Sequence, residues 1–150
     1  MTRYPHKTSA PLPGLVRLTI VGLVATGIGF LGAGVNPGPG PRAVQGAFTV
    51  GPFYLPPLLV GLVTLTIAGL VATRISWMPA VGAAFATILL LGAATFGSAS
   101  VLFRLTHPEL VIGFTEDTLQ LIGEVLAVVA GIAATVQFVR SKAAGHHLTR

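Results

Sequence analysis

Cysteine is absent from the sequence, so disulfides, thiolate chemistry and cysteine-ligated metal sites are excluded. Charge is scarce as well: Asp, Glu, Lys and Arg make up 9% of the 150 residues, against about 25% in an average soluble domain. So few charges cannot cover the surface of a water-soluble domain of this length. Instead the chain carries 53% hydrophobic residues and 19 glycines, and glycine is common in membrane helices. The composition therefore predicts an integral membrane protein.

Four apolar runs are each long enough to cross a bilayer as a helix, which takes about 20 residues. They cover residues 15–35, 53–73, 80–103 and 118–139. Every backbone polar group must be satisfied within the hydrocarbon, which favours helices. We therefore expect an all-α membrane protein, with a single four-transmembrane-helix bundle over residues 15–139 and cytoplasmic tails at 1–14 and 140–150.

The first apolar run could instead belong to a cleaved signal peptide. However, residues 1–17 would make an unusually long n-region, and Leu31-Gly32-Ala33 is a poor cleavage site. We expect an uncleaved first helix.

Lys and Arg are distributed unevenly between the two sides of the predicted bundle. Seven fall on the side that holds both chain ends: Arg3, Lys7, Arg17, Arg74, Arg140, Lys142 and Arg150. Only Arg42 and Arg104 fall on the other side. Because cytoplasmic segments carry the excess of Lys and Arg, we expect both termini in the cytoplasm, loops 36–52 and 104–115 outside, and a plasma (inner) membrane location. The same topology accounts for the net charge of +5 without nucleic-acid binding.

The two predicted outer loops carry different structural signals. Asn36-Pro-Gly-Pro-Gly-Pro41 cannot be helical and ends the first helix. Residues 43–50 could form a short extended segment or hairpin, and Pro56-Pro57 suits the first turn of the second helix. In the second loop, Thr115 followed by two acids predicts the start of the last helix, because an oxygen cap precedes negative charge near the positive end of the helix dipole.

Small residues recur at helical spacing in two of the runs. Gly27, Gly29 and Gly32 fit the dinucleotide pattern G-x-G-x-x-G, but no strand precedes them and they lie within a predicted span, so we reject that interpretation. Small residues four apart instead allow close approach of helix backbones in lipid. The rows that we assign to helix packing are Ala25, Gly29 and Ala33 in the first helix, and Gly123, Ala127 and Gly131 in the last. Both intramolecular packing and packing between chains remain open.

No catalytic motif is found in the sequence: H-E-x-x-H, a P-loop and G-x-S-x-G are all absent. Nothing near His146-His147 completes a metal site. His107 and Glu109 form an outer-loop pair that is better explained as part of a solvated loop. We expect no catalytic residues, no cofactor and no metal.

The strongest polar signal lies in the last run, where Asp117, Gln120 and Glu124 fall on one helical face. At about 1.5 Å per residue, Glu124 lies about 10 Å beyond Asp117, within the outer part of the hydrocarbon. With Arg104, these three residues form a candidate intramembrane polar site. An intramembrane carboxylate is a functional hypothesis by default. The alternative that we favour is structural: Glu124 pairs with Arg104 or Arg42, with Arg104 preferred, and joins the last helix to its neighbours.

Three functions are compatible with these features. Small-residue helix faces and short loops favour a non-catalytic accessory or scaffold subunit, or a homo-oligomeric membrane component. A small proton-coupled transporter that uses Glu124 is the alternative, and a membrane enzyme is the third. The expected partners are the lipid bilayer and a membrane protein or a second copy of the chain.

Overall fold

The computed structural model describes residues 13–35, 49–50, 53–73, 75–96 and 98–147. Apart from one pair of two-residue strands, the regular structure of this part of the chain is helical, which confirms the predicted helical class. The elements in chain order are α1 (Gly14–Val35), β1 (Thr49–Val50), β2 (Phe53–Tyr54), α2 (Leu55–Ala72), α3 (Met78–Phe96), α4 (Ser98–Thr106) and α5 (Val111–His147).

Three helical segments are long and apolar enough to cross a membrane: Gly14–Val35, Met78–Thr95 and Val111–Ala143. The apolar part of α2, Pro56–Ala72, is shorter. At about 1.5 Å per residue, the 18 residues of α2 are about 27 Å long, slightly less than the usual hydrocarbon thickness of about 30 Å. Three of the four predicted spans are therefore supported by length and composition. The predicted span 53–73, which corresponds to α2, is not among them.

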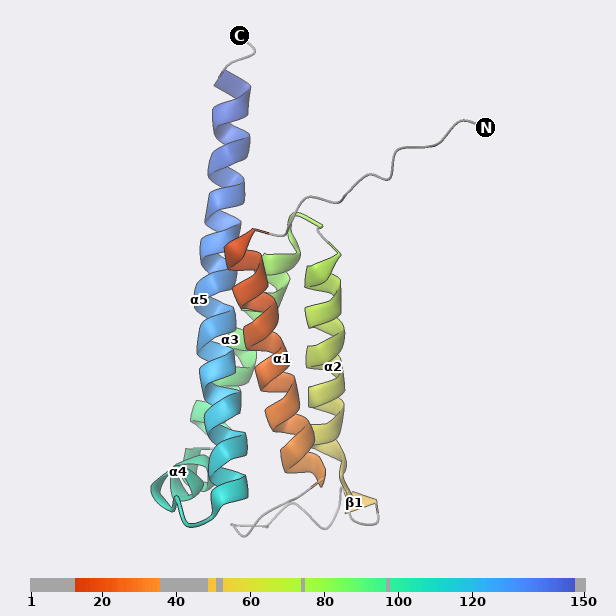
Figure 1. The fold of residues 1–150 in the computed structure, drawn as a ribbon, viewed down its shortest axis with the longest axis vertical. Coiled ribbons are helices and arrows are strands. Elements are labelled where there is room, and N and C mark those ends of the chain that lie inside the picture. The colour runs from red at the N-terminus through yellow and green to blue at the C-terminus, as the bar shows by residue number, and fades with distance from the viewer. Residues whose placement is uncertain (1–12, 36–48, 51–52, 74, 97, 148–150) are drawn as a thin grey trace, which may run out of the picture.

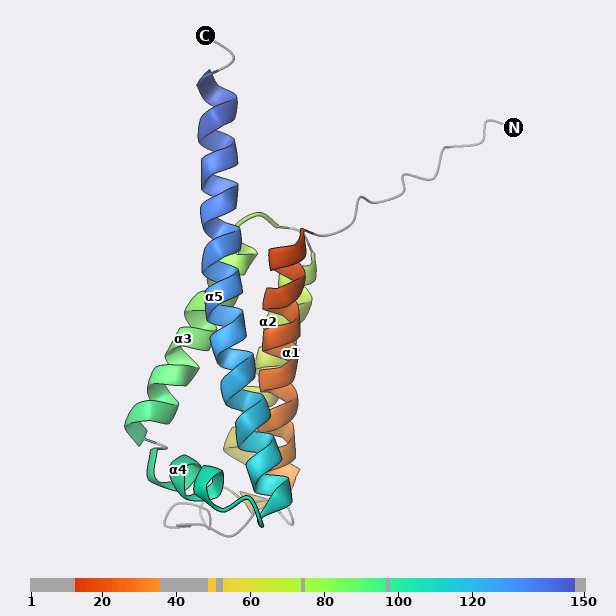
Figure 2. The same ribbon diagram turned by 60° about the vertical axis from the view of Figure 1, so that its left-hand side comes forward.

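The helices run up and down beside one another (Figure 1). Helix α1 has its most extensive contacts with α5 and α2, and α3 packs mainly on α5. Figure 2 shows α3 diverging from α5 along its length, while α4 lies across the end of the bundle and returns the chain to α5. We call the end of the bundle that α4 covers the α4 end. The first residues of α1 and the last turns of α5 both lie at the opposite end (Figures 1 and 2).

The predicted third span, 80–103, is wrong at its C-terminal end. Helix α3 stops at Phe96, and residues 98–106 form the separate helix α4, which lies at an angle to α3 (Figure 2). The sequence at the junction is Gly97-Ser98. Glycine costs about 1 kcal/mol relative to alanine in a helix, and serine prefers helix starts. A span predicted from hydropathy alone takes neither preference into account and therefore runs through this junction.

The last helix begins earlier and ends later than expected. It starts at Val111, and the Thr115 hydroxyl donates to the Val111 carbonyl oxygen at 2.7 Å, so Thr115 lies inside the first turns instead of capping them. The Phe114 amide donates to the Leu110 carbonyl at 2.9 Å, which extends the hydrogen-bonded turn back to that residue. At its other end α5 continues to His147, through most of the predicted tail. Its 37 residues are about 55 Å long, and its last turns project beyond the other helices (Figure 1).

The segment before α2 contains the strand pair. Thr49 pairs with Tyr54 and Val50 with Phe53, in antiparallel register. The predicted extended segment 43–50 is thus seen at its last two residues, and residues 43–48 lie outside the described part. Phe53 and Tyr54 belong to β2 and not to the helix, while Pro56 and Pro57 occupy the first turn of α2 as expected.

Glycines allow the helices to approach closely. An added Cβ at Gly22 or Gly123 would lie 2.6 Å from backbone atoms of the facing helix, so α1 and α5 meet backbone to backbone. The contact of α1 with α2 differs in kind, because Leu65 and Leu31 fill the space beside Gly27 and Gly61. The buried apolar cluster is correspondingly small, with Leu23, Val71, Ala86 and Ala127 among its members.

Candidate functional site

The predicted polar face of α5 is buried in the structure. Relative exposure is 2% for Asp117, 8% for Gln120 and 0% for Glu124. These residues recur at helical spacing, and the turns that carry them face α1 across the close contacts of Gly22 and Gly29. The α1–α5 interface therefore encloses polar side chains among small ones.

Glu124 accepts one side-chain hydrogen bond and is otherwise unpaired. The Gln120 amide nitrogen Nε2 donates to Glu124 Oε1 at 3.1 Å. Glu124 Oε2 is buried and has no hydrogen-bond partner. From the facing helix, the Thr26 hydroxyl donates to the Gln120 carbonyl oxygen at 3.4 Å, which links α1 to the same turn of α5. This arrangement supplies one donor to a carboxyl group that, if charged, would accept several.

The close contacts along α1 and α5 fix the depth of Glu124 in the bundle. Added Cβ atoms show that Gly22 lies against Ala127, and that Gly29 lies against Gln120. In this antiparallel register Glu124 is level with the turn around Ala25, which is near the middle of the 22-residue helix α1. If α1 spans the hydrocarbon, Glu124 lies near its midplane, deeper than the outer position expected from the sequence.

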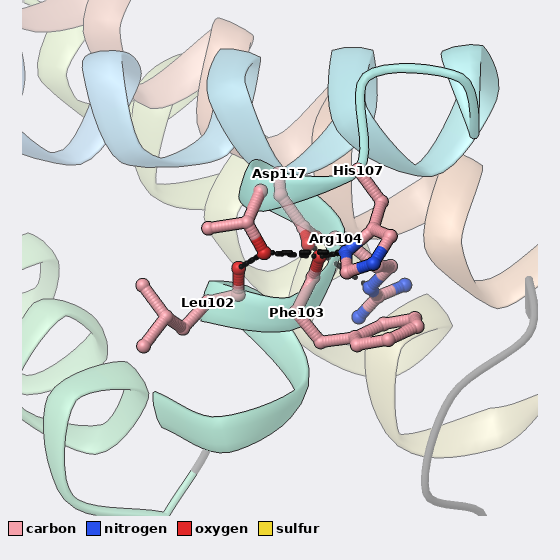
Figure 3. Close-up of polar contacts among 6 residues, drawn as sticks. Leu102, Phe103, Arg104, His107 and Asp117 are labelled. Atoms are coloured by element: carbon pink, nitrogen blue, oxygen red, sulfur yellow. Dashed lines mark hydrogen bonds and ion pairs between the residues drawn. The ribbon is translucent and has the colours of Figure 1, made fainter.

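Arg104 is paired with Asp117, and not with Glu124 as expected. Arg104 Nε lies 3.0 Å from Asp117 Oδ2, with the side chains 18% and 3% exposed (Figure 3). Neither atom meets the angular requirement for a hydrogen bond, so the contact is an ion pair that is not well aligned. The predicted Glu124–Arg104 pair is wrong because the last helix begins earlier than expected, which brings Asp117 rather than Glu124 level with the end of α4. Arg42, the other expected partner of Glu124, lies outside the described residues.

Further buried oxygens lie at the α4 end of α5. Glu116 Oε2 and the Thr118 hydroxyl have no partner. The Glu116 carboxyl group fits beside Gly32 of α1, where an added Cβ would lie 2.7 Å from Oε1. Gly113 performs a similar role for Arg104, because a Cβ there would lie 3.0 Å from the Arg104 Cδ. Burial without partners disfavours the charged form of a carboxyl group.

His107 makes local contacts at the end of α4. Its Nδ1 lies 2.7 Å from the Phe103 carbonyl oxygen and 3.2 Å from the Thr106 hydroxyl, and its ring stacks on Phe103 (Figure 3). Glu109 is exposed. Among the described residues, no group of three or more His, Cys, Asp or Glu side chains is placed to hold a metal ion.

The predicted packing rows lie partly at helix contacts. Gly29 and Gly123 face one another's helices, and Ala127 is completely buried. Gly131 instead faces α3, where an added Cβ would lie 2.8 Å from the Ala83 Cβ and from the Pro79 carbonyl oxygen. Ala25 and Ala33 are half-buried.

The sequence-based site omitted Thr26, Gly22, Gly32 and Gly113. Thr26 carries a signal that could have been used, because a hydroxyl within an apolar span commonly contacts another helix. The glycines carry none individually, because their role depends on which helix faces them.

No family model matches the chain, and comparisons with curated proteins and with solved structures gave no match.

Proposed function

We propose that the chain is a non-catalytic integral membrane protein with four membrane-crossing helices, acting as an accessory or scaffold subunit or as a homo-oligomeric component. The observation that carries this proposal is the reversal of polarity between inside and outside. Large apolar side chains such as Ile88, Leu91 and Val129 are 60–66% exposed, while Thr26, Gln120 and Glu124 are buried. Such a distribution would be unstable in water and suits a lipid surround.

The fourth crossing in this proposal is α2. It runs between the two ends of the bundle beside α1, in the opposite direction (Figure 1). Phe53 and Tyr54 precede it in β2 and lengthen the apolar segment at the α4 end. A helix slightly shorter than the hydrocarbon is accommodated by thinning of the bilayer at modest cost. The chain would then cross four times, through α1, α2, α3 and α5, with both termini in the cytoplasm.

The test of this function has two parts. First, the protein should remain in the membrane fraction after alkaline carbonate extraction, and its release would contradict membrane insertion. Second, its mass in detergent should exceed that of a single 15.4 kDa chain, as a homo-oligomer or with a co-purifying membrane partner. A single chain with no partner would contradict the accessory or scaffold role.

A proton-coupled carrier is the second candidate, because Glu124 Oε2 has no partner. Proteoliposomes distinguish the two functions. Under the first proposal, a proton gradient across vesicles containing the protein dissipates no faster than across empty vesicles. Faster dissipation that is lost in Glu124→Gln would favour the carrier.

A further inference from the structure

The Glu124 carboxyl group is completely buried, so whether it is charged depends on the groups around it. A charged carboxylate at the centre of a bilayer is costly, because hydrocarbon solvates a charge poorly. Proteins offset this cost with a cation or with several hydrogen-bond donors.

No cation is placed to hold a charge on Glu124 in the described part of the bundle. On α1, which packs directly on this face, the charged residue is Arg17, exposed and near the first turn. Helices α2 and α3 contain no charged or histidine residue. On α4 the cation is Arg104, which is paired with Asp117. On α5 itself the nearby titratable groups, Asp117 and Glu116, are acidic and lie toward the α4 end.

Hydrogen-bond donors are also too few. Gln120 Nε2 supplies one hydrogen bond to Oε1, and Oε2 receives none. The hydroxyl of Thr26 is used on the Gln120 carbonyl oxygen, and that of Thr19 on the Leu15 carbonyl at 2.9 Å. Thr64, also fully buried, donates to the Val60 carbonyl at 2.7 Å. The buried hydroxyls of α1 and α2 are therefore engaged elsewhere.

We propose that Glu124 is a reversible proton-binding site in the α1–α5 interface, and that it carries its proton when the protein is in a bilayer at neutral pH. The proton resides on Oε2, and Oε1 accepts the hydrogen bond from Gln120. A bound proton neutralises the Glu124 side chain without a metal ion and without a second carboxyl group. The inference rests on the proposed membrane insertion and extends it, since it assigns a bound ion whether or not the protein transports protons.

The experiment uses the whole chain in phosphatidylcholine vesicles, after carbonate extraction has verified insertion. Dicyclohexylcarbodiimide is a lipid-soluble reagent that takes up a protonated carboxyl group across one C=N bond: the proton goes to nitrogen and the carboxyl oxygen to the central carbon, giving an O-acylisourea. Where water is excluded, the acyl group then moves from that oxygen to nitrogen, which leaves a stable N-acylurea with no group lost. Treatment at neutral pH followed by peptide mass analysis should locate the adduct at Glu124. Its yield should fall as the pH is raised, because the reactive form is lost.

Two variants make the result specific. Glu124→Gln keeps an oxygen that can accept from Gln120, so it should fold and lose the adduct. Glu109→Gln, at an exposed acid, should leave the yield at Glu124 unchanged. Infrared spectra provide an independent measurement, in which the carbonyl band of a protonated carboxylic acid at neutral pH should be present in the parent and weaker in Glu124→Gln, with the difference between the two spectra assigned to Glu124. Inserted protein with neither the adduct nor the difference in that band would overturn the proton site without affecting the proposal of membrane insertion.

Discussion

The Arg104–Asp117 ion pair connects α4 to α5 at a place with little access to water. Asp117 is 3% exposed, so an unpaired charge there would be poorly solvated. Arg104 is 18% exposed and passes beside Gly113, which leaves room for its aliphatic part. The contact is thus sensitive to loss of either partner, which distinguishes it from an exposed pair worth about 0–1 kcal/mol.

A double-mutant cycle measures this sensitivity. We expect Asp117→Asn and Arg104→Gln each to lower stability in detergent, and the double variant to lose less than the sum of the two. The coupling energy should be within the range of about 0.5–3 kcal/mol found for residues in direct contact. Thermal or denaturant unfolding of the four proteins provides the measurement. Additive effects would mean that the ion pair contributes nothing to folding.

The matched comparison is the cycle of Glu124→Gln with Arg104→Gln. Because Arg104 is paired with Asp117 and Glu124 with Gln120, we expect a smaller coupling between Glu124 and Arg104 than between Asp117 and Arg104. The same unfolding measurements apply. A larger coupling in this second cycle would restore the direct pair that the sequence suggested.

At this scale the sequence identified the polar residues but not their partners. Helical spacing was enough to place Asp117, Gln120 and Glu124 on one face, and their burial agrees with that inference. The partner of Arg104 depended on where α5 begins, which was judged from the apparent cap at Thr115. Helix starts are among the least certain features in a sequence, because several neighbouring residues can serve as caps.

At the scale of the element, glycine determines which helices touch. The contacts of α1 with α5 and with α2 use different sides of α1 and different means. Toward α5, the glycines remove side chains so that backbones meet, and toward α2 they accommodate leucines. Central placement of α1 follows from its having small residues on both sides.

Alanine substitution at two helical glycines separates packing from helix propensity. A Cβ at Gly123 would lie 2.6 Å from the Gly22 carbonyl oxygen, while at Gly69 nothing lies within 4 Å. Alanine favours a helix over glycine by about 1 kcal/mol, so Gly69→Ala should be neutral or stabilising. Gly123→Ala should destabilise by about 1–3 kcal/mol, as overpacking does. Unfolding in detergent decides, and equal effects at the two positions would exclude a tight α1–α5 contact.

A larger substitution tests the separate contact between α5 and α3. Gly131 lies against Ala83 and the Pro79 carbonyl, so Gly131→Leu should push α3 away and lower the unfolding temperature. Gly92→Leu is a suitable control on α3, because nothing lies within 4 Å of its added Cβ. Parent-like unfolding of Gly131→Leu would mean that this side of α5 faces lipid.

Long apolar runs predicted helices α1, α2 and α5 reliably, because hydropathy persists over many residues. The break between α3 and α4 was missed because Val101, Leu102 and Phe103 continue the apolar run past the junction, although Ser98–Thr106 as a whole is less apolar than α3. Hydropathy indicates which segments are apolar but not the direction of the helix axis relative to the bundle. A helix that turns across the end of a bundle therefore looks like the end of a span.

At the scale of the whole molecule, α5 is the element that relates the two ends. It begins at the α4 end and projects at the opposite end, where Arg140 and Lys142 are exposed (Figure 1). Because α5 is about 55 Å long, it exceeds the hydrocarbon thickness of about 30 Å, so if it crosses the bilayer it extends beyond it on at least one side. The basic residues near its C-terminal end favour the cytoplasm for that side.

Cysteine labelling can test this topology directly, because the chain has no native cysteine. We choose two exposed positions near the two ends of α5: Glu109, just before the helix, and Ser141, in its projecting turns. Seven basic residues at one predicted side against two at the other predict that Ser141 lies in the cytoplasm and Glu109 outside. In intact cells, a membrane-impermeant maleimide should therefore label Glu109→Cys at once, and Ser141→Cys only after the membrane is opened. The reverse pattern would mean that the bundle is inserted upside down. Labelling of both variants from the outside would mean that α5 does not cross the membrane, which would also remove the basis for placing Glu124 at its midplane.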